Sequence, residues 1–269
     1  MIISPTHRFI FFKTQKTAGT SMEGALRKFC GPNALLTGSR NLGARKTEEY
    51  SSQNNIDSDG WARFHQHCDP EHFYRKIAYP DDFAKFDKLT IIRNPYESVV
   101  SQWFYGQNRM IKDYGYKYMF PISEGFNRIG PDGTDYWTGW VLDKSDSKEV
   151  CIEKFSQWCT QAAPKASYHY GDEFVKETGP VTNSRNERFV HPCITHYFRY
   201  ENLIDDYKSF LKEKNLEFSE LPRYKTNNNT EVKREHYSYY YNDELIEIVK
   251  KLFPKTFETF GYTFDRRVK

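Results

Sequence analysis

The chain has 269 residues, of which 38% are hydrophobic, 28% charged and 17% aromatic, and this is the composition of a soluble globular protein. Its formal net charge is only +3, which argues against nucleic acid as the main partner but leaves room for a local anion site. No stretch approaches the ~18 apolar residues of a membrane span and no basic, apolar leader is visible, so the sequence predicts a cytoplasmic protein.

The first predicted elements form a strand followed by a helix. The segment 8–12 is a short apolar run of β-forming residues, which predicts a buried strand. Apolar residues then recur at helical spacing from Met22 to Phe29, and Thr20–Glu23 has the form of a capping box. Gly31 and the proline after it are expected to end this helix.

The same order occurs twice more. A second buried strand is predicted at Leu89–Ile92, and Pro95 lies where the first turn of the next helix should be. A third strand is predicted at Ile194–Arg199, followed by a helix from Leu203 to Leu211. Repeated strand–helix units predict an α/β fold with a mostly parallel sheet flanked by helices, and such sheets bind ligands at the carboxyl ends of their strands.

The remaining chain contains one more clear helix and two regions without periodicity. The helix is expected to begin at Asn242-Asp243 and to end before Pro254. Residues 36–63 and 107–148 show no regular pattern. Because long irregular segments in a compact domain usually carry function, we expect a binding role for the Tyr- and Trp-rich region 107–148.

The segment Lys13–Glu23, at the end of the first strand, has the character of an anion cradle. Ala18 and Gly19 let the backbone approach an anion closely, and the helix N-terminus directs unpaired N–H groups at it. Lys16 adds a positive charge. Hydroxyl groups lie nearby on Thr17, Thr20 and Ser21. Taken alone, the segment is also compatible with a glycine-containing turn and an incidental lysine.

The cradle is not a Walker A loop. That motif needs Gly-Lys-Ser/Thr at the helix entry, and the chain contains no Gly-Lys dipeptide. Here the lysine precedes the small residues, so the usual hydroxyl–Mg²⁺ arrangement of nucleotide hydrolases is missing.

A second anion motif follows the second strand. Arg93 leaves that strand and can form a bidentate contact with a phosphate. Ser101, about two helical turns further on, lies on roughly the same helix face as Asn94, so arginine and serine can converge on one group. The alternative is a surface arginine and a helix serine without a joint role.

Together these motifs resemble the PAPS-dependent sulfotransferases, most closely their carbohydrate O-sulfotransferase branch (PAPS is 3′-phosphoadenosine 5′-phosphosulfate). The run Lys16–Ser21 resembles the family's 5′-phosphosulfate loop, and Arg93 with Ser101 resembles its 3′-phosphate signature. The likeness implies a P-loop-nucleotide-kinase-like three-layer fold, a single domain over residues 1–269, PAPS as the donor, PAP as the product and no metal. Many relatives carry a second arginine where this chain has Ser98.

The resemblance also assigns roles to individual residues. It implies that Lys16 contacts the bridging oxygen between phosphate and sulfonate, with Lys13 as a second basic candidate. The 5′-phosphate is then held by Thr17, Ala18, Gly19, Thr20 and Ser21. The acceptor implied is a hydroxyl-bearing molecule, most closely a carbohydrate, bound by an insertion at 107–148.

Transfer to a hydroxyl also needs a base, and His65-Gln-His-Cys68 lies between the two motifs. Relatives often have a histidine base in this interval, so His67 is the first candidate and His65 the second; a carboxylate base, as in other branches, stays open. With His72, these residues could instead bind zinc, although their alternation fits a strand better. The five cysteines, an odd number without a CxxC pair, indicate free thiols.

Two other functions remain open at the level of the sequence. A nucleotide kinase or related phosphoryl transferase would require Mg²⁺-dependent turnover of ATP, and the missing Gly-Lys-Ser/Thr argues against it. A non-catalytic nucleotide-binding module would bind PAP without transferring sulfate.

Overall fold

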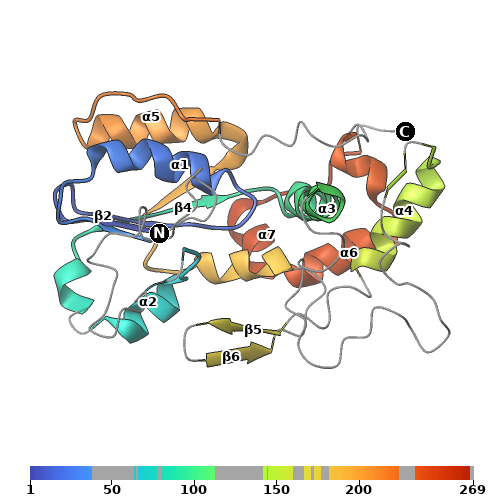
Figure 1. The fold of residues 1–269 in the computed structure, drawn as a ribbon, viewed down its shortest axis with the longest axis horizontal. Helices are drawn as coiled ribbons and strands as arrows, with labels where there is room; N and C mark the ends of the chain where they lie inside the picture. Colours follow the sequence, from blue (N-terminus) through green and yellow to red (C-terminus); the bar gives the residue numbers. More distant parts are fainter. Residues whose placement is uncertain are drawn as a thin grey trace. The chain divides into compact units, whose positions relative to one another are not determined.

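The computed structural model describes residues 1–37, 64, 66–77, 80–112, 142–143, 145–159, 167–170, 173–176, 182–223 and 234–266. The chain divides into two compact units, Met1–Asn94 with Arg185–Lys225 and Pro95–Ser184 with Thr226–Lys269 (Figure 1). Within the described ranges, no helix combines the length and apolarity needed to cross a membrane. The prediction of a single domain stays a prediction, and residues 113–141 and 144 of the expected insertion lie outside the described residues.

A five-stranded sheet forms the centre of the first unit, in the order β3-β1-β2-β4-β7. The predicted strands β2 (Phe9–Phe12), β4 (Asp87–Ile92) and β7 (His196–Arg199) pair in parallel, which confirms this part of the expected topology. The strands β1 (Ile2–Ser4) and β3 (Leu35–Leu36) extend the sheet in antiparallel pairing. These two strands were not predicted, because two or three residues are too short to show a period.

Helices cover both faces of this sheet. On one side lie α1 (Gly19–Leu26) and α5 (Leu203–Glu213), and on the other lies α2 (Pro70–Lys76) (Figure 1). Alternate residues of β2 serve the two faces: Phe9 and Phe11 pack into the cluster that holds α1 and α5, whereas Ile10 and Phe12 pack with Phe73 of α2. The first unit is therefore a three-layer α/β arrangement, and its central strands are apolar on both faces, as parallel strands usually are. Short 3₁₀ segments complete it at η1 (Arg27–Phe29), η4 (Pro80–Phe83) and η8 (Tyr200–Asn202), with η7 (Thr182–Phe189) spanning the boundary of the two units.

The predicted capping box at the start of α1 is wrong. The N-cap is Ala18, in a left-handed conformation with φ 60°, and no side chain caps the helix. The carboxylate of Glu23 instead accepts a hydrogen bond of 2.6 Å from Lys13 Nζ in the interior. The side chain that a capping box would hold at the helix surface is therefore part of a tertiary ion pair in the interior.

Aromatic side chains form much of the described core of the second unit. Its elements are α3 (Pro95–Lys112), α4 (Lys148–Gln157), the antiparallel pair β5 (Ser167–Tyr170) and β6 (Glu173–Lys176), η9 (Tyr237–Tyr240), α6 (Asp243–Leu252) and α7 (Pro254–Phe260). In its core, Trp103 lies against Phe155 with ring centroids 5.0 Å apart and against Tyr240 at 5.5 Å. Pro95 opens α3 as predicted.

The predicted start of α6 at Asn242-Asp243 is confirmed, and its N-cap gives a simple test of the second unit. Asn242 Oδ1 accepts a 2.9 Å hydrogen bond from the Leu245 amide. We expect Asn242→Ala to lower the free energy of unfolding by about 1 kcal/mol, measured by denaturant titration. Asn202, which precedes α5 without making a cap bond, provides the matched control, and Asn202→Ala should change stability by less than about half as much. Equal losses in both variants would contradict the capping role.

Candidate donor-binding site

The loop between β2 and α1 is fixed to the neighbouring strand by hydroxyl groups. Thr14 Oγ1 donates to the Ile91 carbonyl of β4 at 2.6 Å and lies 2.7 Å from Thr17 Oγ1. Lys16 and Ala18 adopt left-handed conformations, with φ 59° and 60°. Because each such conformation costs a non-glycine residue about 1–2 kcal/mol, the surrounding contacts must hold the loop in this shape.

The start of α1 has the geometry of an anion cradle. The Ser21 and Met22 amides donate to the Ala18 carbonyl, whereas the amides of Gly19 and Thr20 have no acceptor among the described residues. Left-handed loop residues beside a helix N-terminus turn amides toward a common concave side. A Cβ at Gly19 would lie 2.8 Å from Lys13 Cγ and 3.2 Å from the Thr14 carbonyl oxygen, so a side chain here would force the buried Lys13 stem and the loop backbone to shift. These features fit a phosphate-like group.

The two basic candidates of this loop have different surroundings. Lys13 is 3% exposed, and its ammonium pairs with the fully buried Glu23 at 2.6 Å. Burial alone would raise the pKa of Glu23, but the ammonium groups at Met1 and Lys13 hold that pKa below its usual value. Lys16 is only half-buried. The charge of Lys13 is therefore balanced inside the protein, and its role toward a ligand stays a prediction.

Arg93 connects the two predicted phosphate motifs. Its Nη1 donates to the Lys16 carbonyl at 2.7 Å, and its guanidinium stacks on the Tyr200 ring with 3.9 Å to the ring centroid. The next amide, of Asn94, donates to Glu201 Oε1 at 2.7 Å. The structure thus brings Arg93 to the loop between β2 and α1, although the two residues are 77 positions apart.

Ser101, the second residue of the predicted 3′-phosphate motif, is buried on α3. It belongs to the second unit, whereas Arg93 belongs to the first. The joint action of the two residues therefore stays a prediction.

His67 is attached to the same loop. Its Nδ1 lies 2.8 Å from the Lys13 carbonyl oxygen. Because a carbonyl oxygen can only accept, Nδ1 must carry the proton, and this places the lone pair of the neutral ring on Nε2. The contact therefore fixes the tautomer that a general base needs. His65 lies outside the described residues.

The zinc alternative stays untested, because His65 lies outside the described residues. Burial raises the pKa of the neighbouring Cys68 thiol to about 12. Within the described ranges, the one group with metal-ligand spacing is Asp87, His196 and Glu213, and there the Lys214 ammonium pairs with Asp87. All five cysteines are described and are free thiols, as the sequence predicted.

One further contact with the loop was not predicted. The Gln15 amide donates to Asn186 Oδ1 at 2.9 Å, and Asn186 Nδ2 donates to the Gln15 carbonyl at 2.9 Å. Asn186 lies in η7, 171 residues after Gln15 in the sequence. Nothing in the local sequence around Asn186 signals this contact, because a polar residue in a short helical segment has many possible partners.

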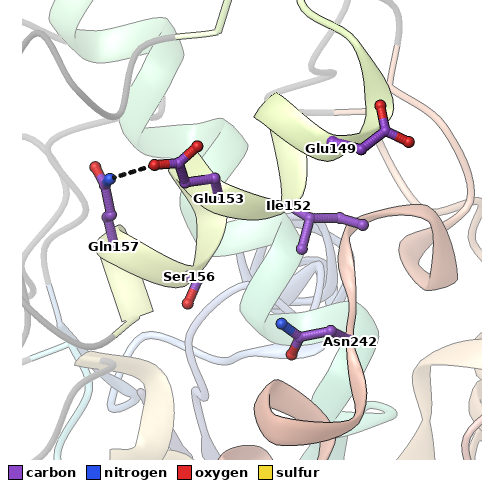
Figure 2. Close-up of a pocket in the computed structure, with 6 residues that line it drawn as sticks. All are labelled: Glu149, Ile152, Glu153, Ser156, Gln157 and Asn242. Carbon is purple, nitrogen blue, oxygen red and sulfur yellow. Dashed lines mark hydrogen bonds between the residues drawn. The ribbon is translucent and has the colours of Figure 1, made fainter.

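A groove of about 400 Å³ lies elsewhere, in the second unit. Figure 2 shows its wall, formed by α4 side chains and by Asn242 at the start of α6, with Gln157 Nε2 donating to Glu153 at 3.3 Å. The lining residues are Glu149, Ile152, Glu153, Ser156, Gln157 and Asn242. None of the predicted site residues lines it, and its two carboxylates do not suit a phosphate or sulfate.

Comparison with known proteins gives one finding. A family model described as the sulfotransferase family matches residues 1–263, a range that includes the loop between β2 and α1, His67 and Arg93. No curated protein and no solved structure gives a significant match.

Proposed function

Because the chain belongs to the sulfotransferase family, we propose that it moves the sulfonyl group of PAPS to a hydroxyl of an acceptor and releases PAP. The family generally uses PAPS as its sulfonyl donor. The observation that carries the proposal is the hydrogen bond from Arg93 Nη1 to the Lys16 carbonyl, 2.7 Å long, since it joins the residues expected to bind the two phosphate ends of one donor.

In this proposal the residues of the first unit hold the 5′ end of PAPS. The helix amides and hydroxyls of Thr17 to Ser21 bind the 5′-phosphate, and the Lys16 ammonium lies at the bridging oxygen between phosphate and sulfonate. Arg93 binds the 3′-phosphate, with Ser101 as its partner. Lys13 contributes a more distant positive charge, because its ammonium is paired with Glu23.

The reaction is an in-line displacement at sulfur. A new bond forms between the acceptor oxygen and sulfur while the bond from sulfur to the 5′-phosphate oxygen breaks, and that oxygen leaves with the electron pair as part of PAP. His67 Nε2 takes the proton of the acceptor hydroxyl, and Lys16 stabilises the negative charge that develops on the leaving phosphate. Otherwise these residues act by orienting the reacting groups.

The acceptor is proposed to be a carbohydrate hydroxyl, in line with the branch that the loop resembles. Its binding region is expected at 107–148, most of which lies outside the described residues. The cytoplasmic location expected from the sequence likewise stays a prediction.

Binding of PAP and of AMP, which lacks the 3′-phosphate, tests the donor site. We expect the wild-type protein to bind PAP more tightly than AMP, and Arg93→Ala to lower PAP affinity by about 10- to 100-fold, the value of a charge-assisted hydrogen bond to phosphate. AMP affinity should fall by a smaller factor, because for AMP only the support of the loop through the Lys16 carbonyl is lost. Isothermal titration calorimetry measures both. Ser101→Ala should reduce the preference for PAP in the same direction.

An unchanged PAP affinity in Arg93→Ala would contradict the 3′-phosphate assignment. Activity is then tested by transfer of radiolabelled sulfate from PAPS to a panel of glycans and small alcohols. Tight PAP binding without transfer to any acceptor would favour a binding module, and Mg²⁺-dependent turnover of ATP would favour a kinase.

A further inference from the structure

The side chain of Asn186 binds both backbone groups of Gln15. Its Oδ1 accepts from the Gln15 amide and its Nδ2 donates to the Gln15 carbonyl, each at 2.9 Å. One amide side chain thus forms hydrogen bonds with both the N–H and the C=O of Gln15, as a neighbouring strand would. Gln15 is half-buried, so these bonds are only partly exposed to competing water.

The residue that follows is Lys16, whose left-handed backbone is unfavourable for a lysine. Its carbonyl is bound by Arg93 Nη1 at 2.7 Å. The loop is therefore held from two sides, by Asn186 at position 15 and by Arg93 at position 16. Such conformations persist where the surrounding structure fixes them, and they are common at functional sites.

We propose that Asn186 is a positioning residue of the donor site. It holds Gln15, and through Gln15 it keeps Lys16 in the left-handed conformation from which the ammonium reaches the donor. This role rests on the proposed function of the loop as the phosphosulfate site. Asn186 acts through the loop backbone and takes no part in the transfer itself.

Amide exchange tests the contact without any ligand. Asn186→Ala removes both hydrogen bonds, and we expect the Gln15 amide to exchange at least about 10-fold faster in NMR measurements. Asn186→Asp keeps an acceptor for that amide but turns a carboxylate oxygen toward the Gln15 carbonyl oxygen, so the Gln15 amide should be protected less than in the wild type and more than in Asn186→Ala. Arg188→Ala is the control on the same segment: it removes the ion pair of Arg188 with Asp69 but keeps both hydrogen bonds of Asn186 to Gln15, and should leave exchange at Gln15 unchanged.

Steady-state kinetics of the complete protein tests the role. Both Asn186 variants should lower kcat for sulfate transfer by about 10-fold, the effect expected from losing about 1.4 kcal/mol of support, with an unchanged KM for the acceptor. Arg188→Ala should keep wild-type kcat. Lost protection of the β2 amides would show that Asn186→Ala does not fold. In that case, the kcat of Asn186→Asp tests the role instead.

The outcomes separate this inference from the proposed function. Unchanged exchange at Gln15 in Asn186→Ala overturns the contact. Faster exchange with wild-type kcat overturns the positioning role. If the wild-type protein binds no PAP, the proposed function fails and takes the role toward the donor with it, whereas the exchange result still decides whether Asn186 holds the loop.

Discussion

Replacing His67 with asparagine should lower kcat for sulfate transfer by about 10²- to 10⁴-fold, the usual contribution of a general base. The asparagine Nδ2 can occupy the place of histidine Nδ1 and keep the bond to the Lys13 carbonyl, which is 2.8 Å long in the native chain. It has no group at the position of Nε2, so it cannot take the proton of the acceptor. Affinity for PAP, measured by calorimetry, should stay within about threefold, because the loop keeps its support.

A second substitution distinguishes the structural role of Nδ1 from the catalytic role of Nε2. His67→Gln places an amide near the position of Nε2 but gives up the bond to Lys13, so the variant should be inactive and should also lose some thermal stability. Substantial turnover in His67→Asn would show that the base lies elsewhere. His65→Asn would then be the next variant, followed by carboxylates, because the sequence left those candidates open.

The strand–helix junctions of the fold could be predicted because they depend on local patterns. Short apolar runs at 8–12 and 89–92 predicted β2 and β4, and Pro95 predicted the start of α3. The antiparallel strands β1 and β3 have only three and two residues, too few for any period. What sets them is pairing with distant segments, which no local pattern records.

The candidate site was predictable where a motif supplies the ligand groups and not where tertiary contacts support them. The loop Lys16 to Ser21 and Arg93 were found by motif. Asn186 was missed, because its partner is 171 residues away and its contact is with backbone atoms, which are the same for every residue type. Glu23 was assigned wrongly, since a capping box is a local pattern and a buried ion pair is not.

The choice between the two loop lysines is the clearest example. Both precede the small residues of the cradle, and the sequence alone gives each a plausible role. The structure separates them by burial and charge, with Lys13 paired to Glu23 in the interior and Lys16 half-buried at a backbone position held by Arg93. This contrast leads to different expected defects for the two substitutions.

Lys16→Met should lower kcat by about 10²- to 10³-fold, since it removes the positive charge that stabilises the leaving phosphate in the transition state. Methionine is similar in length and is not branched at Cβ, so the left-handed backbone costs it no more than it costs lysine, and the melting temperature should change little. Affinity for PAP should fall by a smaller factor, since this charge acts mainly where negative charge develops during transfer. Stopped-time transfer assays and calorimetry measure these quantities.

Lys13→Met is the matched control, and it should show the opposite defect. It leaves the buried carboxylate of Glu23 with only the Met1 ammonium as its charged partner, so the free energy of unfolding should fall by about 1–3 kcal/mol. At a temperature where the variant is still folded, its kcat should exceed that of Lys16→Met. If the Lys13 variant instead stays fully stable and loses as much kcat as the Lys16 variant, then Lys13 is the lysine at the reacting sulfonate, and the assignment made from burial and charge is reversed.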